Sequence, residues 1–280
     1  MDDNQEIRRW SSYLGDPAAA ARLAVFFAQE NSLLEEIQGK VAERHEAFWG
    51  VIFPLLYSIS DSNRAFHLLA THQAMRGAYV MARMSFEAIV NTCFIMSEGN
   101  AAADRARRHA QQKSFRDMDR EIHGVDLRLM CDGKDEAAPD SELQASLAMF
   151  TNKKGREITQ WTPETVKERI DAIEKKYGPR ASGGLNFGLF AIYRHGSEIA
   201  HGSLFGALFS LGLTYPGTPR SGDELSGYLT TNISSLLWFL GKSVNSLIFV
   251  FQKELGLDGV YEKSQALISE YQPGSNKCAS

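Results

Sequence analysis

The sequence predicts an all-α protein, a bundle of long antiparallel helices with appended short helices. Three observations favour this fold class. The 84 residues between Pro54 and Pro139 contain no proline, and their apolar residues recur every three or four positions, which is the period of an α-helix. Strong helix start and stop signals recur along the chain. No persuasive run of alternating apolar and polar residues indicates a β-strand.

Capping residues and helix breakers place the helices in order. Ser, Thr, Asp and Asn cap a helix because their side chains accept hydrogen bonds from free N–H groups of its first turn, whereas Gly and Pro end it. These signals predict helices over 17–39, 41–58, 63–97, 101–122, 163–177, 223–255 and 260–270, with caps at Asp16, Asp61, Ser62, Asn100 and Thr162 and a stop at Gly178 and Pro179.

The helices divide into an N-terminal set and a main bundle. We expect residues 1–60 to pack on the core, 61–272 to form the bundle that carries the site, and 273–280 to be a flexible tail. Eleven of the 23 glycines fall within 178–227, a nearly uncharged and aromatic-rich stretch. Because glycine lets backbones approach closely, this stretch should contain either close helix packing or a site.

Charge and cysteine content exclude several classes of protein. A net charge of −4 and a pI near 6.0 argue against a protein that coats DNA. Because the three cysteines form no Cys-x-x-Cys pair, we expect a reducing compartment and no structural zinc. The acidic start does not resemble a secretory signal, which predicts a cytoplasmic protein. The apolar stretch 225–251 contains Lys242 and two asparagines, so we interpret it as a buried or partner-covered helix rather than a membrane span.

A polar stripe runs through the otherwise apolar segment 63–97. Its members are spaced by 4, 3, 4 and 4, so one continuous helix would present them on one face. They are His72, Arg76, Tyr79, Arg83 and Glu87. Since the segment is too apolar to be largely exposed, we expect its charges to be paired, with Arg83 and Glu87 one turn apart. The stripe is either a core ion pair or the wall of a pocket.

A second polar cluster follows at 193–202. Arg194, Glu198 and His201 stand at i, i+4 and i+7 and share a helix face, with Ser197 beside them. This face combines a cation suited to phosphate with a group that titrates near neutral pH. Such a pair can cleave RNA, with Arg194 holding the scissile phosphate and His201 moving protons. Alternatively, Arg194 and Glu198 form a routine helix pair and His201 is a helix-terminal histidine.

The cluster resembles the motif of HEPN-superfamily ribonucleases, which are found in toxins and phage-defence proteins. That motif is an Arg, usually followed by Asn, Asp or His, with four to six intervening residues before a His, on a late helix of an all-α bundle. Arg194, His195 and His201 match it with six intervening residues. The resemblance implies that Arg194 and His201 are catalytic and His195 supporting. It also implies a site shared across a homodimer, metal-independent cleavage that leaves a cyclic phosphate, and an antitoxin or defence partner.

The chain also resembles an uncharacterised bacterial family of all-helical proteins. The features are an Arg-x-x-x-Glu step, here Arg83 to Glu87, and a Ser-x-x-x-His-Gly-Ser run, here Ser197 to Ser203. This likeness extends from about residue 66 to the end of the last long helix. It implies no particular chemistry.

Other enzyme classes lack part of their required pattern. Glu198 and His201 form one Glu-x-x-His step, but a di-iron bundle needs two, so we expect no metal. Ser197 as a nucleophile lacks an orienting acid other than the adjacent Glu198. The glycine-rich run 178–184 follows a helix rather than a strand, which excludes a phosphate loop, and we expect no organic cofactor.

Two cationic segments could supply a track for RNA. The helix predicted over 101–122 carries six Lys or Arg residues against four acidic ones, which is typical of a solvated face or of a phosphate-contacting surface. The cluster Lys153, Lys154 and Arg156 fits a solvated helix end or an RNA contact.

The main rival to a nuclease is a non-catalytic helical interaction module. In that hypothesis one buried polar network locks two helices together, and its members are Arg83, Glu87, Arg194, Glu198 and His201. A solvent-reaching position of Arg194 and His201 favours the enzyme, whereas full burial against Arg83 and Glu87 favours the module.

Overall fold

The structure is a computed structural model that describes residues 10–122, 125–128, 140–213 and 221–272. The chain forms two compact units. We call Met1–Ser97 with Thr165–Ser280 the bundle unit and Glu98–Glu164 the insert unit. The tail expected at 273–280 lies outside the described residues.

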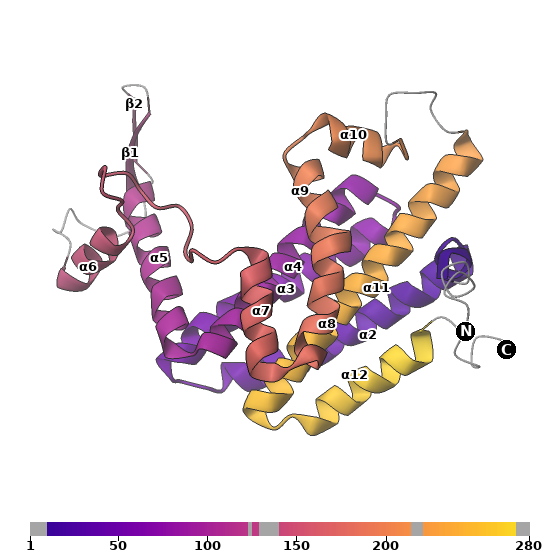
Figure 1. Cartoon of the computed structure of the whole chain (residues 1–280), viewed down its shortest axis with the longest axis horizontal. Helices are drawn as coiled ribbons and strands as arrows, with labels where there is room; N and C mark the ends of the chain where they lie inside the picture. The colour runs from indigo at the N-terminus through magenta and orange to yellow at the C-terminus, as the bar shows by residue number, and fades with distance from the viewer. Residues whose placement is uncertain (1–9, 123–124, 129–139, 214–220, 273–280) are drawn as a thin grey trace. The chain divides into compact units, whose positions relative to one another are not determined.

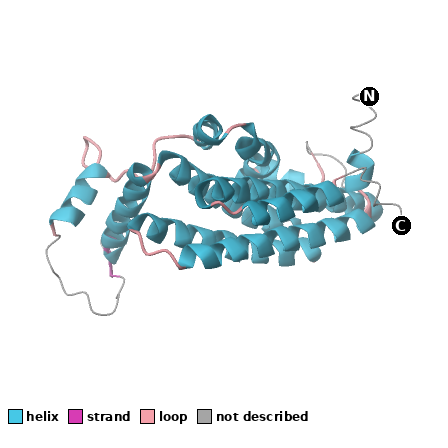
Figure 2. Ribbon diagram, turned by 90° about the horizontal axis from the view of Figure 1, so that it is seen from below, coloured by secondary structure: helices cyan, strands magenta, loops and turns pink. Residues whose placement is uncertain are grey.

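The bundle unit is helical throughout its described part, which confirms the predicted all-α class. The long helices α2 and α11 lie side by side, and α12 packs against both (Figure 1, Figure 2). The helices of this unit are α2 (Pro17–Ala42), α3 (Ala47–Thr71), α4 (Met75–Glu98), α7 (Val166–Tyr177), α8 (Pro179–Gly188), the π-helix η1 (Leu189–Tyr193), α9 (Arg194–Ala200), α10 (Leu204–Ser210), α11 (Gly222–Leu255) and α12 (Asp258–Tyr271).

The long C-terminal helix is the central element of the bundle. α11 begins at Ser221, whose side chain accepts from the N–H of Glu224 in a capping box, and it ends at Gly256 in the left-handed region. By length and composition it is the one helix of the described residues apolar enough to cross a membrane, yet most of its apolar window is buried in the bundle. This agrees with the prediction of a buried helix over 225–251.

The segment 63–97 is not one helix. α3 begins at Ala47, runs through the domain boundary expected at residues 60 and 61, and ends at His72, whereas α4 begins at Met75. Between them Gln73 adopts a positive φ of 54°, which breaks the helical path. The polar stripe is therefore divided, since His72 ends α3 while its other members lie on α4.

The insert unit contains a short β-hairpin that was not expected. α5 (Asn100–Met118) ends four residues before the predicted end of its helix, and β1 (Asp119–Ile122) pairs antiparallel with β2 (Val125–Arg128). The β-branched Ile122 and Val125 form the last pair of the ladder, and such residues favour strands over helices. α6 (Ser141–Met149) follows.

The start of α7 lies three residues later than predicted. Its N-cap is Thr165, which forms a capping box with Glu168, whereas Thr162 donates to the carboxylate of Glu164 instead. Of the two candidate threonines, only Thr165 has a glutamate three residues on, and that glutamate returns the hydrogen bond. The predicted stop at Gly178 is confirmed, with φ at 83°.

Glycines set the distance between α8 and its neighbours. A methyl group at Gly184 would collide with the backbone carbonyl of Lys242 in α11, and one at Gly188 would collide with the ring of Phe86 in α4. The hydroxyl of Ser243 donates to the Gly184 carbonyl at 3.3 Å across the same contact. The glycine-rich stretch therefore provides close helix packing, which was one of the two roles predicted for it from the sequence.

A carboxyl group is buried where α2, α11 and α12 meet. Glu30 is fully buried, and both of its oxygens lie 2.7–2.8 Å from the hydroxyl of Ser264, which in turn accepts from Asn245. Burial raises the pKa of Glu30 to about 8, against smaller opposing effects of the Ser264 hydrogen bond and of Lys242. The neutral carboxylic acid is therefore the main form at neutral pH.

Replacing Gly184 by alanine should lower the free energy of unfolding by about 1–3 kcal/mol, because the added methyl group overpacks the contact with α11. Gly183→Ala is the matched control, since a methyl group there meets nothing within 4 Å and should stabilise the helix by about 0.5–1 kcal/mol. Urea unfolding of the two variants measures both effects. Equal stabilities would contradict the close packing.

The stability provided by Glu30 should depend on pH. Because its pKa is raised from 4.5 to about 8 on folding, its contribution is complete below about pH 4.5 and is lost as the pH rises through about 8. Glu30→Gln should therefore gain stability relative to wild type between pH 5 and pH 9 in urea unfolding. The exposed Glu36→Gln on the same helix should leave the wild-type profile unchanged. Parallel profiles for Glu30→Gln and wild type would rule out the buried carboxylic acid.

Candidate functional site

The predicted motif occupies the end of one continuous helical rod. α8 continues through the five residues of η1 into α9, which ends at His201, followed by Gly202 with φ at 66°. Ser203 then caps α10, accepting from the N–H of Gly206. Single π turns occur often at functional sites, and here the π turn directly precedes Arg194.

Arg194, Glu198 and His201 lie together on the exposed face of α9. At about 100° per residue they lie roughly 140–200° around the helix from Gly196. Gly196 faces α4, because a methyl group there would lie 2.8 Å from the Cβ of Arg83. The structure thus brings these three predicted residues together and points them to solvent.

Arg83 and Glu87 lie on the other side of α9. A guanidinium nitrogen of Arg83 is 3.7 Å from the carboxylate of Glu87, and the guanidinium carbon lies 5.3 Å from the ring centre of Tyr193. Both charged side chains are half-buried and form a local pair. The five residues of the rival hypothesis therefore do not form one buried network, because the helix itself separates the pair from the face that bears Arg194.

His195 and Ser197 differ in their surroundings. The ring of His195 stacks on Phe209 with centroids 4.6 Å apart and also lies against Tyr79 and Phe205. Burial lowers the pKa of His195 and so favours the neutral ring, and a hydrogen bond to the Ala191 carbonyl offsets this only in part. Ser197 is half-buried, and its carbonyl accepts the N–H of His201 at 3.0 Å. His195 thus joins α9 to α10 through packing.

Apolar side chains are exposed on both sides of the motif. Phe190 is 66% exposed one turn before Arg194, and Leu204 is 69% exposed three residues after His201. Phe187, Phe205 and Leu211 are exposed as well, so five of the ten large exposed apolar residues of the described chain fall within 25 positions. The sequence interpretation missed this patch, although the aromatic content of 178–227 was its signal. We call these five residues the apolar patch; so many exposed apolar side chains within one short segment indicate an interaction surface.

No group of side chains among the described residues is suited to binding a metal ion. No cluster of three or more His, Cys, Asp or Glu is placed to bind an ion there. A cavity of about 650 Å³ lies near the ends of α2 and α11, with Lys40, Arg44 and Leu255 in its lining. None of the site residues predicted from the sequence lines it.

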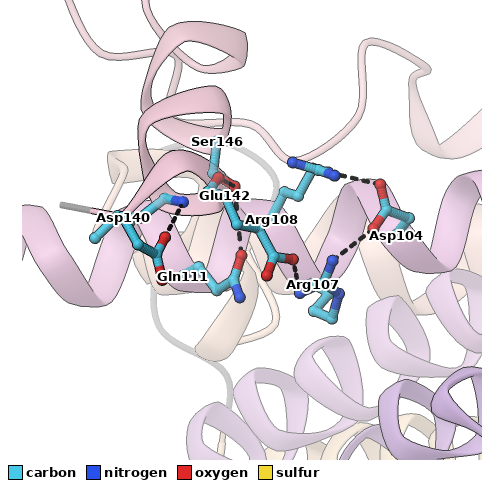
Figure 3. Close-up of polar contacts among 8 residues, drawn as sticks. Asp104, Arg107, Arg108, Gln111, Asp140, Glu142 and Ser146 are labelled. Atoms are coloured by element: carbon cyan, nitrogen blue, oxygen red, sulfur yellow. Dashed lines mark hydrogen bonds and ion pairs between the residues drawn. The ribbon is translucent and has the colours of Figure 1, made fainter.

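The cations of α5 are engaged within the insert unit. Arg107 pairs with Asp104 at 2.7 Å and with Glu142 of α6 at 2.6 Å, and Arg108 pairs with Asp104 at 2.6 Å (Figure 3). Hydrogen bonds from Arg108 and, to a smaller extent, from Arg107 lower the pKa of Asp104. Lys113 pairs with Glu157 at 3.1 Å. The cations of this helix therefore hold α6 and the following loop. Because they are already paired, α5 is poorly suited to binding the phosphates of RNA.

Comparison with known proteins places the chain in a family. A model of a family of unknown function, DUF5677, matches residues 50–214, which is more than half of the chain, so the protein belongs to that family. The matched region contains Arg83, Glu87, Arg194 and His201. Neither a curated protein nor a solved structure shows a significant match.

Proposed function

We propose that this member of a family of unknown function is a HEPN-like, metal-independent endoribonuclease that acts as a homodimer through Arg194 and His201. The observation that carries the proposal is the common exposure of Arg194 and His201 on one face of α9, in a segment where exposed apolar residues flank them in the sequence. If Arg194 and His201 had only a structural role in the core, both side chains would be buried rather than exposed.

The chemistry follows from the two side chains. Arg194 presents a planar fork of N–H donors that matches two oxygens of a phosphodiester. The ribose 2′-oxygen loses its proton to a base and attacks phosphorus, the P–O5′ bond breaks, and the 5′-oxygen takes a proton from an acid. His201 is the group of this face suited to both proton transfers. Two copies of the chain provide two such histidines, one as base and one as acid.

The apolar patch supports a dimer at this face. Phe190 and Leu204 bracket the motif in the sequence, and burying each large apolar side chain is worth about 1.5–3 kcal/mol. A second copy that covers these residues would also enclose Arg194 and His201 and partly exclude water, which strengthens electrostatic interactions at the phosphate.

The rival interaction module draws less support from the geometry. It requires Arg194 and His201 to be buried and saturated by Arg83 and Glu87, but both are exposed. The biological setting that we propose, a cytoplasmic toxin or phage-defence protein with an antitoxin or defence partner, rests on the HEPN resemblance alone.

Removing either motif side chain should abolish RNA cleavage without unfolding the protein. Arg194→Ala and His201→Ala should each lower the rate on a total-RNA substrate by about 10²-fold or more, because each removes phosphate binding or proton transfer. Their melting temperatures should stay within about 2 °C of wild type, since both side chains are exposed.

Matched controls exist in the same unit. His72 is another exposed histidine at the end of a helix, and Arg64 is an exposed arginine on α3. His72→Ala and Arg64→Ala should retain full cleavage. A wild-type protein that cleaves no RNA, or motif variants that cleave normally, would refute the nuclease.

A charge in the apolar patch should disrupt the dimer. Phe190→Glu should convert the protein from dimer to monomer in sedimentation velocity at micromolar concentration and lower RNA cleavage in parallel, because a desolvated carboxylate opposes association. Leu68→Glu alters a similarly exposed apolar residue of α3 and should leave the dimer intact. Wild-type protein that is monomeric while it cleaves RNA would contradict the dimer.

A further inference from the structure

The insert unit contains three exposed cations that have no acidic partner. Lys153, Lys154 and Arg156 are exposed, and no ion pair involves them within the described part of the chain. The cations of α5 differ in this respect, because Arg107, Arg108 and Lys113 are neutralised by carboxylates, and Arg105 and Arg116 are half-buried and donate to neutral oxygens. Among the described residues of the insert unit, exposed positive charge without an acidic partner is thus found in the loop 152–156, which we call the basic loop.

The basic loop is a tight turn held by its first residue. The side-chain oxygen of Asn152 accepts the N–H groups of Lys154 at 2.8 Å and of Arg156 at 3.1 Å, and its backbone carbonyl accepts the N–H of Gly155 at 2.9 Å. Gly155 has φ at 73°, a conformation that favours glycine. The backbone of the loop is therefore fixed before any ligand binds.

The base of the loop is anchored to α5. Thr151 and Glu157 form an antiparallel bridge, and Phe150 beneath it is fully buried. Arg116 donates to the hydroxyl of Thr151 at 2.7 Å, and Lys113 pairs with Glu157 at 3.1 Å. The cations of α5 thus support a rigid hairpin that projects three further cations into solvent.

We propose that the basic loop binds the phosphate backbone of single-stranded RNA. The choice of RNA as the polyanion rests on the proposed function. Three charges within four residues match successive phosphates of one strand, and a fixed loop loses little entropy on binding. The loop contains no apolar side chain, which disfavours insertion into a lipid surface. Three of its N–H groups, those of Lys154, Gly155 and Arg156, already donate to Asn152, so the contact is made by side chains.

The test measures the salt dependence of binding in the full chain. A fluorescein-labelled 20-mer of uridine is titrated with His201→Ala protein, which should not cleave it, at 50–300 mM KCl. Adding Lys153→Gln, Lys154→Gln and Arg156→Gln should reduce the slope of log K against log[KCl] by about 2, because each single-strand phosphate contact contributes roughly 0.7. The melting temperature should not change, since the three side chains are exposed and hold no part of the fold.

A matched triple variant controls for net charge. Lys167→Gln, Lys175→Gln and Lys263→Gln remove three exposed cations of the bundle unit and should leave the slope unchanged. Equal slopes for the two triple variants, or no binding of the 20-mer at 50 mM KCl, would overturn the proposal. Loop-dependent binding to phosphatidylserine vesicles without RNA binding would overturn it in favour of a membrane.

The two proposals can fail separately. If wild type cleaves no RNA but the loop variant still loses about 2 units of slope, only the nuclease is refuted. If cleavage requires His201 while the two triple variants bind the 20-mer equally, only the loop is refuted.

Discussion

The close approach of α8 to α11 and α4 is the constraint on which the candidate site depends. At Gly184 and Gly188 no side chain fits between the helices, so the separation and rotation of α8 are fixed by contact with the backbone of Lys242 and with the ring of Phe86. The rod continues into α9, and the exposed side there carries Arg194, Glu198 and His201. The position of the motif is thus a consequence of glycine packing farther down the same helix.

The π turn maintains that rotation. Gly188 and Gly196 both face α4, against Phe86 and Arg83 respectively. In an uninterrupted α-helix eight residues rotate by about 800°, which would turn Gly196 about 80° away from Gly188. One extra residue in the turn at 189–193 removes about 100° and restores the common direction to within roughly 20°. The insertion therefore keeps both glycines against one helix and keeps Arg194 on the outside.

Local sequence signals predicted much of the fold but not the path between helices. The Asp16 and Gly178 boundaries were predicted from capping chemistry, and the long apolar run predicted the buried α11. The break at Gln73 left no such signal, because neither glycine nor proline marks it. Spacing along the sequence grouped Arg194 with His201. It could not show that Arg83 lies on the opposite side of α9, because that depends on the rotation of α9 that brings Gly196 against α4. The apolar patch was present in the sequence as aromatic residues, but their exposure depends on tertiary packing.

Two groups of exposed charged side chains, one on the face of α9 and one in the basic loop, each suit a different task. The exposed face of α9 carries Arg194 together with Glu198, so its net attraction for a polyanion is small and its value lies in the orientation of Arg194 and His201. The basic loop carries three cations and no carboxylate, but it contains no group that titrates near neutral pH and cannot move protons there. If both proposals hold, the insert unit supplies attraction to the RNA backbone and α9 supplies the chemistry. A net charge of −4 is compatible with the proposed RNA binding because several other described cations, among them Arg107 and Lys113, are neutralised by carboxylates within the fold.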